Sequence, residues 1–555
     1  MRTTVIRVCI AALSALTLNP SARADLISDW GATASSHISQ NALGGSPGYF
    51  QTWRGGTMVR VAMFDAANAA LGGYTPYALN VTAPGASPEA AVSVAAYTVL
   101  TNLGTAGLDA LNTALSSSLA TIPDGPAKEA GMGIGKLAAE MIIRLRAGDN
   151  PALSVPGPTN TSAVGRWRPT PPNFAAAFGT QGRYLTPWTM RSAAQFRPDP
   201  PPSLTSAIYT ADFNEIRVLG SRANTNRTPE QAASAELREK GENWGADVYR
   251  QHPLPLLESA RREALVWMAG MDAYIQIFDA KYTYNFWRPI TAIRNGALDG
   301  NNDTPGDPAW TPFLDTHSHP DYPSALVLGN AAMMEILIQL HGDQFSFSAT
   351  STNPDRTRTF AKLSDYVEDA ITARVVGGTH FRHTCNVSAE TGRQIARHAF
   401  QRYLRPVPRL QTGPSQPGEF ALVVQPDLPF RYSVETSSDL VLEHDLPNRH
   451  VAQQQGIRHR VQRRAGRVRE SLRFSAEPQE RAGIQEDGSQ APLLELGLRQ
   501  GRQRLGGNVK GLAGHATHFR PNRTIRRKER RRPGDRALAP RDQEFMALLD
   551  RSEVP

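Results

Sequence analysis

The chain has 555 residues, of which 40% are hydrophobic and 20% are charged. This length suffices for two or three ordinary domains or for one large helical domain with extensions, and it allows a substantial core. The formal net charge is +9, but about +7 of it lies in residues 411–555, which hold about 25 basic and 18 acidic side chains. The rest of the chain is close to neutral, which argues against nucleic-acid binding by the main body.

Residues 1–24 have the features of a signal peptide. Two arginines precede an apolar run from Val8 to Leu18, and Ala22-Arg23-Ala24 follows as a small-residue cleavage pattern. The apolar run is shorter than the roughly 18 residues that a membrane-spanning helix needs, and no later run reaches that length. We therefore expect an exported protein, secreted or periplasmic, that does not span a membrane.

Cys385 is the only cysteine of the expected mature chain, because Cys9 lies within the signal peptide. A single cysteine forms no internal disulfide, so the stability of the fold must come from packing. We interpret the Cys385 thiol as a buried bystander rather than as a nucleophile.

Residues from about 25 to 405 are predicted to form helices joined by loops rich in proline and glycine. Ser87-Pro88 is a helix start signal, and Thr228-Pro229-Glu230-Gln231 is a capping box that opens another helix. Period-two alternation is rare, and there is no regular internal repeat. The sequence thus predicts an all-α fold of helical bundles, with an N-terminal helical part at residues 25–250 and a core part at residues 251–408.

The composition of the chain changes after about Pro408. Arginine outnumbers lysine by about ten to one, aromatic residues become fewer and hydrophobic periodicity fades. We interpret residues 409–555 as an extension that does not belong to the same fold and is either disordered or spurious, for example translated out of frame. The alternative is a basic arm that binds nucleic acid or an acidic surface.

Two cations follow an apolar helical stripe in the core part. The stripe from Trp267 to Phe278 has the spacing of a buried helix face, and the same spacing continues to Lys281 and Arg288. Burial of unpaired cations is costly, so these side chains either turn toward solvent or meet an anion inside the fold. Pro289 is expected to end the helix.

The segment from His317 to Leu326 reads His-Ser-His-Pro-Asp-Tyr-Pro-Ser-Ala-Leu and precedes an apolar helical run that extends to Leu340. Ser324 stands at the predicted helix start. Backbone N–H groups there lack intrahelical partners, and the helix dipole favours negative charge. This segment is therefore a second element that favours an anion.

Arg374 and His380 flank the pair Gly377-Gly378. A helix from about Thr357 is predicted to end at these glycines, which let the chain turn sharply, so that both side chains can point into one space. The guanidinium group can bind two oxygens of a tetrahedral oxyanion, and the imidazole can supply a ligating or nucleophilic nitrogen.

Taken in order, these segments resemble the signature of the vanadium haloperoxidase and type 2 phosphatidic acid phosphatase superfamily, especially that of its secreted bacterial members. The signature reads Lys-x6-Arg-Pro, then Pro-Ser-Gly-His, then Ser-Arg-x5-His. The matching segments are Lys281 to Pro289, Pro323-Ser324-Ala325-Leu326, and Ala373-Arg374 to His380. The residues around the second and third segments and the early Phe64-Asp65-Ala66-Ala67-Asn68-Ala69 also match, so the resemblance covers most of residues 25–405.

The resemblance implies a site for vanadate or phosphate. The oxygens would be contacted by Lys281, Arg288 and Arg374, with Ser324 and the Ala325 amide completing the cradle. His380 would bind vanadium axially in a peroxidase, or attack phosphorus in a phosphatase. The leading function is oxidation of a halide by hydrogen peroxide with vanadate as cofactor, and the alternative is hydrolysis of phosphate monoesters on the same residues without a cofactor.

The sequence departs from the signature at three positions. The second segment normally ends in a histidine that transfers protons, and this chain has Leu326 there. Loss of a general acid or base removes a factor of about 10²–10⁴ in rate, so oxyanion binding can persist while turnover falls. Ala325 replaces glycine but keeps its amide, whereas Ala373 replaces serine and removes a hydroxyl group. A non-catalytic oxyanion-binding relative is therefore a third reading.

Three other histidines lie near the signature, namely His317, His319 and His383. Transfer of protons by one of them, in place of the missing histidine, is left open. The expected partners are small molecules, either hydrogen peroxide and a halide or a phosphate ester, and a homo-oligomer is also left open.

Overall fold

The computed structural model describes residues 26–407, apart from residues 160–161, 241–243 and 351–356, and seven strands between residues 409 and 499. The predicted signal peptide lies outside the described residues. No helix among the described residues is long and apolar enough to cross a membrane.

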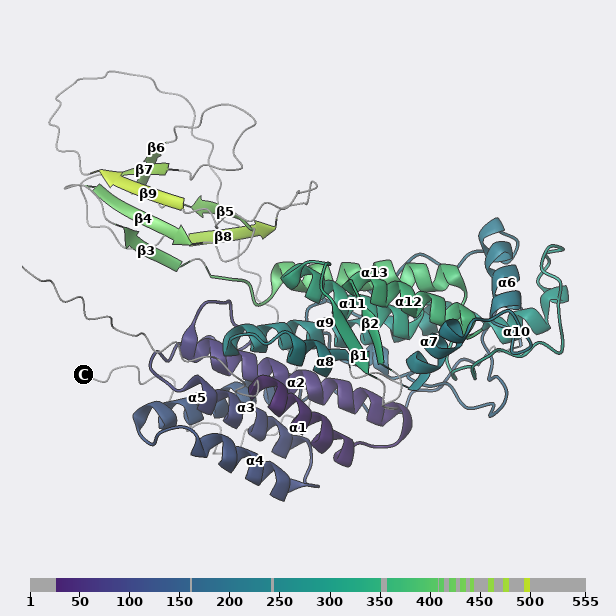
Figure 1. Ribbon diagram of the computed structural model, residues 1–555, viewed down its shortest axis with the longest axis horizontal. Helices are drawn as coiled ribbons and strands as arrows, with labels where there is room; N and C mark the ends of the chain where they lie inside the picture. The colour runs from purple at the N-terminus through teal and green to yellow at the C-terminus, as the bar shows by residue number, and fades with distance from the viewer. Residues whose placement is uncertain are drawn as a thin grey trace, which may run out of the picture. The chain divides into compact units, whose positions relative to one another are not determined.

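The described part of residues 26–407 is mostly helical (Figure 1), which confirms the predicted all-α fold. The α-helices are α1 (Leu26–Asn41), α2 (Gly45–Leu71), α3 (Pro88–Leu103), α4 (Leu108–Ala120), α5 (Pro126–Leu145), α6 (Ala207–Leu219), α7 (Pro229–Lys240), α8 (Trp244–Gln251), α9 (Leu256–Tyr284), α10 (Pro289–Arg294), α11 (Ala325–His341), α12 (Leu363–Val376) and α13 (Arg382–Arg402). Short 3-10 helices, η1 (Gly182–Tyr184) and η2 (Gly296–Leu298), lie in the loops.

Helix α9 joins two groups of helices. It packs against α2, which also contacts α3 and α5, and against α11 and α13, which pack on each other. Figure 1 shows α9 between the purple and blue helices α1 to α5 and the green helices α11 to α13. Its residues are buried almost throughout, because it faces both groups. The end of α9 therefore lies inside the fold, where a charged side chain needs an internal partner.

The helix starts follow the predicted capping signals. The Ala90 amide donates to the Ser87 hydroxyl at 3.2 Å, with Pro88 as the first residue of α3. At α7, the Gln231 amide donates to the Thr228 hydroxyl at 3.2 Å, and the Thr228 amide donates to the Gln231 side chain at 3.0 Å. This reciprocal pair is the predicted capping box.

Two predicted helix boundaries are wrong. Helix α9 ends at Tyr284, because Asn285 adopts the left-handed conformation with φ of 50° and its amide bonds back to Lys281 O. Arg288 therefore lies outside that helix, and Pro289 begins α10 instead of ending α9. The helix predicted from about Thr357 starts only at Leu363.

The segment before α12 is a strand instead. Strand β2 (Thr357–Phe360) pairs with β1 (Phe347–Thr350) as an antiparallel hairpin. Phe360 faces Phe347 and contacts the Tyr366 ring on α12. Packing of these aromatic side chains against α12 accounts for the strand.

Strands also occur in the segment after residue 408. They are β3 (Arg409–Gly413), β4 (Glu419–Gln425), β5 (Phe430–Glu435), β6 (Leu440–Glu443), β7 (Arg458–Arg463), β8 (Arg473–Pro478) and β9 (Leu494–Arg499). Five of them form one sheet in the order β3-β4-β9-β7-β6, and β5 pairs with β8. The prediction that this extension does not belong to the main fold stays a prediction.

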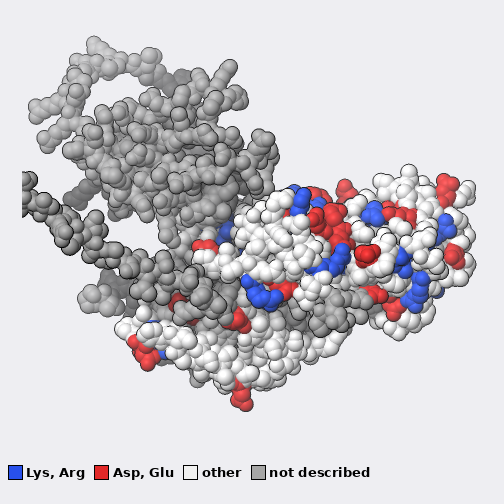
Figure 2. Space-filling view, in the orientation of Figure 1, with Lys and Arg blue, Asp and Glu red and all other residues white. Residues whose placement is uncertain are grey.

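Charged side chains of both signs are interspersed on the surface of the helical part. On the face that Figure 2 shows, lysine and arginine alternate with aspartate and glutamate, without a continuous basic surface. This agrees with the near-neutral charge of the main body in the sequence.

Glycines bring α5 close to α3. A Cβ atom on Gly135 would lie 2.3 Å from Ala91 O, and one on Gly131 would lie 2.3 Å from Ser87 O. The exposed Gly133 of the same helix has open space at this position. The α3 and α5 backbones can therefore approach only because these two positions carry no side chain.

We expect Gly135→Ala to lower the free energy of unfolding by about 1–3 kcal/mol, because the methyl group would collide with a backbone carbonyl. Gly133→Ala is the matched control and should raise it by about 0.5–1 kcal/mol through helix propensity. Urea denaturation followed by circular dichroism measures both. Equal effects of the two variants would contradict this account of the packing.

Candidate active site

The Lys281 ammonium group is fully buried in the last turn of α9. It donates to Pro320 O at 2.5 Å and to Asp321 O at 3.1 Å. Burial and the neighbouring Arg288 hold the pKa of Lys281 well below its usual value. A lysine ammonium group has three N–H donors, so one N–H is left for a further acceptor after the hydrogen bonds to these two carbonyls.

Arg288 is fully buried at the start of α10. Its guanidinium donates to His319 O at 2.7 Å, to Thr379 O at 2.7 Å, to His319 Nδ1 at 2.9 Å and to His380 Nε2 at 3.1 Å. Burial lowers the pKa of Arg288 to about 10. The arginine thus joins the second and third signature segments at one point.

His380 lies between this arginine and a buried carboxylate. Its Nδ1 is 2.9 Å from Asp321 Oδ1, and Thr384 Oγ1 donates to Asp321 Oδ2 at 2.6 Å. The Nδ1–Oδ1 contact is close but not aligned as a hydrogen bond. Because arginine only donates, the Nε2 lone pair accepts from Arg288, and the proton of the neutral ring lies on Nδ1. Burial raises the pKa of Asp321 to about 7. Asp321 is not among the predicted site residues, because its contact with His380 joins segments that are far apart in the sequence.

Ser324 precedes the first residue of α11, and its side chain is fully buried. Its amide donates to Ser388 Oγ at 2.7 Å. Its own Oγ has no hydrogen-bond partner and does not cap the helix. A buried hydroxyl group without a partner is costly, which points to a ligand at this position.

Arg374 lies in the last turn of α12, and Gly378 follows with φ of 74°. A Cβ atom on Gly378 would lie 2.4 Å from Gly220 O, so the turn requires glycine. Arg374 donates from one nitrogen to Glu239 Oε2 at 3.2 Å, whereas its buried Nε and its other terminal nitrogen have no hydrogen-bond partner. This arginine has the most unused donors of the three cations.

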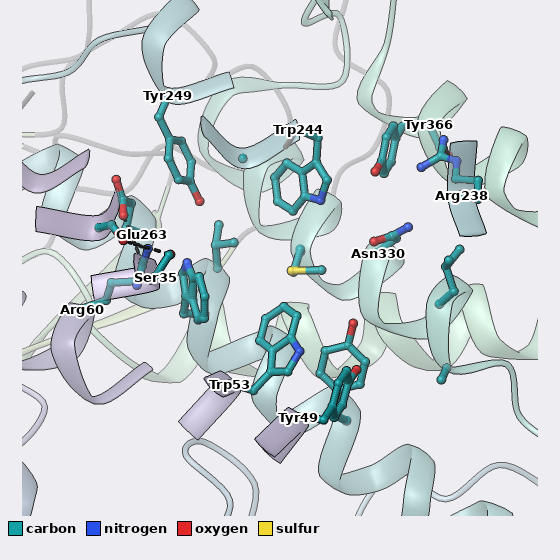
Figure 3. Close-up of a pocket in the computed structure, with 18 of the residues that line it drawn as sticks. Ser35, Tyr49, Trp53, Arg60, Arg238, Trp244, Tyr249, Glu263, Asn330 and Tyr366 are labelled. Atoms are coloured by element: carbon teal, nitrogen blue, oxygen red, sulfur yellow. Dashed lines mark hydrogen bonds and ion pairs between the residues drawn. The ribbon is translucent and has the colours of Figure 1, made fainter. Parts of the chain in front are cut away.

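A cavity of about 1290 Å³ opens beside this site. Arg374, His380, Ala325 and Leu326 line it, whereas the buried residues Lys281, Arg288 and Ser324 are not among its lining residues. Figure 3 shows its far part, where Tyr49, Trp53, Trp244, Asn330 and Tyr366 surround an open space and Arg60 pairs with Glu263 at one end.

Together, the predicted site residues form a buried pocket of donors. Among the residues that the structure describes, Ser324 Oγ and two nitrogens of Arg374 have no hydrogen-bond partner, and Asp321 and Glu239 are the carboxylates that lie beside the three cations. An oxyanion fits these orphaned groups, because it accepts hydrogen bonds on all sides. Among the described residues, no group of three or more His, Cys, Asp or Glu side chains could hold a metal cation.

The other candidate residues are arranged differently. His317 and His319 line the cavity, whereas His383 on α13 does not. The Cys385 thiol is buried, and burial raises its pKa, as expected of a bystander. Phe286 and Trp287 belong to a second hydrophobic core with Tyr209, Phe213, Ile216, Ile290, Ala292, Ile293, Trp310, Tyr322 and Phe381, so these aromatic residues pack rather than line the cavity.

We expect the His380 ring to stay neutral well below pH 6.5, because burial and the cations Arg288 and Lys281 lower its pKa. The unfolded chain binds a proton there near pH 6.5, so this histidine should make the free energy of unfolding decrease as the pH falls through that value. An NMR titration of isotopically labelled histidines, assigned with His380→Gln, measures the midpoint. A midpoint at or above pH 6.5 would contradict the described surroundings.

Comparisons with known proteins agree with the helical fold. Residues 262–408 match the family model of the VCPO second helical-bundle domain. The crystal structure of a bacterial vanadium-dependent iodoperoxidase is 21% identical with a TM-score of 0.57, and the match covers 67% of this chain and 95% of that chain. An apo-type bacterial vanadium-dependent chloroperoxidase is 17% identical with a TM-score of 0.50, covering 64% and 94%. No curated protein matches the sequence significantly.

The fold is therefore that of the vanadium haloperoxidases. Residues 262–408, which contain all three signature segments, are in addition similar to the second helical-bundle domain of the VCPO family model.

Proposed function

We propose that this protein is a vanadate-dependent haloperoxidase-like enzyme that oxidises a halide with hydrogen peroxide. The observation that carries the proposal is the buried set of donors without partners, Ser324 Oγ and two nitrogens of Arg374, beside His380. The likeness to bacterial haloperoxidases supports it through the fold. From the N-terminal sequence pattern, we further propose that the protein is exported.

Vanadate would be held by Lys281, Arg288, Arg374, Ser324, the Ala325 amide and Nε2 of His380. The three cations favour a multiply charged anion, and burial keeps water from weakening their attraction. Asp321 Oδ1 lies 2.9 Å from His380 Nδ1 and would favour a proton there, which would leave Nε2 as the ligand. The chemistry that vanadate supplies when bound is activation of hydrogen peroxide toward the halide.

The overall reaction combines one halide ion, one hydrogen peroxide molecule and one proton to give hypohalous acid and water. The halide loses two electrons and the peroxide gains them. Protons must therefore move at the site, and Leu326 transfers none. The leucine side chain borders the cavity at the position where the family signature has histidine. On this proposal, turnover depends on another proton carrier or proceeds slowly.

We expect Arg374→Ala to weaken vanadate binding by about 10–100-fold, because it removes the donors that have no other partner. Calorimetric titration measures the binding, and bromide- or iodide-dependent halogenation of a dye measures turnover, which should fall at least as much. Arg393→Ala is the control, since Arg393 pairs with Glu368 and Glu390 on the surface of α13. Equal vanadate affinity of the two variants would contradict the proposed site.

The same assays separate the alternatives. Hydrolysis of a chromogenic phosphate ester that vanadate inhibits, without halogenation, would identify a phosphatase on the same residues. Tight vanadate binding with neither activity would identify a non-catalytic oxyanion-binding relative.

A further inference from the structure

A histidine and a carboxylate meet in the cavity wall next to the proposed vanadate site. His317 Nε2 lies 3.3 Å from Glu239 Oε1, and the two side chains are 44% and 31% exposed. Both residues line the cavity together with Arg374 and His380. His317 comes from the loop before α11 and Glu239 from α7, so this pair is formed only by the tertiary fold.

Glu239 connects this histidine to the oxyanion-binding residues. Its second carboxylate oxygen accepts a hydrogen bond from Arg374 at 3.2 Å. The carboxylate therefore places His317 beside the arginine that has the most unused donors. A proton held on His317 would lie in the wall of the same cavity as Arg374 and His380, with the Glu239 carboxylate beside it as counter-ion.

His319 is less suited to carry a proton. Its Nδ1 accepts from Arg288, and it lies against the rings of Phe178 and Phe278. Burial and the cations Lys281 and Arg288 hold the pKa of His319 well below its usual value, and no carboxylate contact raises it. His319 would become a cation among cations, which is unfavourable.

The groups that face His317 have opposing effects. Burial and the cations Arg288, Arg374 and Lys281 lower its pKa to about 4, although the Glu239 carboxylate raises it. The neutral His319 ring lies 5.6 Å away. His317 is therefore neutral at neutral pH and able to accept a proton, and Glu239 stabilises the charged form once it exists.

We propose that His317, paired with Glu239, is the proton carrier of this site and replaces the histidine that is missing at Leu326. This inference rests on the proposed haloperoxidase function. Because His317 Nε2 lies 3.3 Å from Glu239 Oε1, we place the proton of the neutral ring on Nε2. Nδ1 then accepts a proton from hydrogen peroxide and returns it to the oxygen that leaves as water. The further proton that the reaction consumes comes from solvent through the same ring.

The first experiment compares His317→Gln with His383→Gln in the full-length, vanadate-loaded enzyme. His317→Gln should lower kcat for halogenation by about 100-fold, within the range for loss of a general acid–base group. Its dissociation constant for vanadate, measured by calorimetry, should stay within about threefold of the wild-type value. His383 lies outside the cavity, so its variant should keep wild-type kcat.

Leu326→His provides a test by suppression. In the His317→Gln background, Leu326→His places an imidazole on the cavity wall at the signature position. The double variant should therefore have a kcat at least tenfold higher than that of His317→Gln alone. In the wild-type background, Leu326→His should change kcat by a smaller factor than it does in the His317→Gln background, because a proton carrier is already present. Restoration also shows that His317→Gln left the rest of the site folded.

The second experiment tests the pair itself and needs no turnover. An NMR titration follows the His317 ring in the wild-type protein and in Glu239→Gln. Loss of the carboxylate should lower the His317 pKa by about one unit. An unchanged midpoint would overturn the pairing.

The outcomes separate this inference from the proposed function. An active wild-type enzyme whose His317→Gln variant keeps more than a third of kcat overturns the role of His317 and leaves the haloperoxidase proposal standing. A wild-type protein that binds vanadate but shows no halogenation overturns both.

Discussion

The site depends on the burial of three cations around one neutral histidine. Lys281, Arg288 and Arg374 are all buried, and within the described part of the chain the carboxylates of Asp321 and Glu239 offset their charge. Backbone carbonyls of the segment before α11 and of the turn before α13 accept most of their hydrogen bonds. Burial of three neighbouring cations raises the free energy of the folded protein, and a bound anion lowers it again. The surrounding helices therefore have to hold the cations rigidly.

The helices do so by converging from different parts of the chain. Lys281 lies in the last turn of α9, and Arg288 lies at the start of α10. Arg374 lies at the end of α12, and His380 follows in the glycine turn. Because α9 contacts both groups of helices, the position of Lys281 depends on the packing of each. The site is thus a product of the whole helical part rather than of one loop.

Local signals predicted much of this arrangement, and long-range contacts account for the rest. Ser87 and Thr228 marked helix starts because their hydrogen bonds reach only three residues ahead. The buried stripe before Lys281 was visible as periodicity. The end of α9 was misplaced because Asn285 adopts a left-handed conformation that periodicity does not reveal. The roles of Asp321 and Glu239 were not predicted, since each contacts a partner far away in sequence.

The location of Glu239 on α7 has a consequence for how such proteins are classified. Helix α7 is tied to α12 by Ser234 and Arg238, which both bond to Asp369, so Glu239 is held in place by residues outside the three signature segments. A search for those segments would not find the proposed proton carrier His317, which Glu239 supports in this way. Chains that lack the signature histidine should therefore be classified by the side chains that face the position of Arg374 in the folded structure, and not by the missing histidine alone.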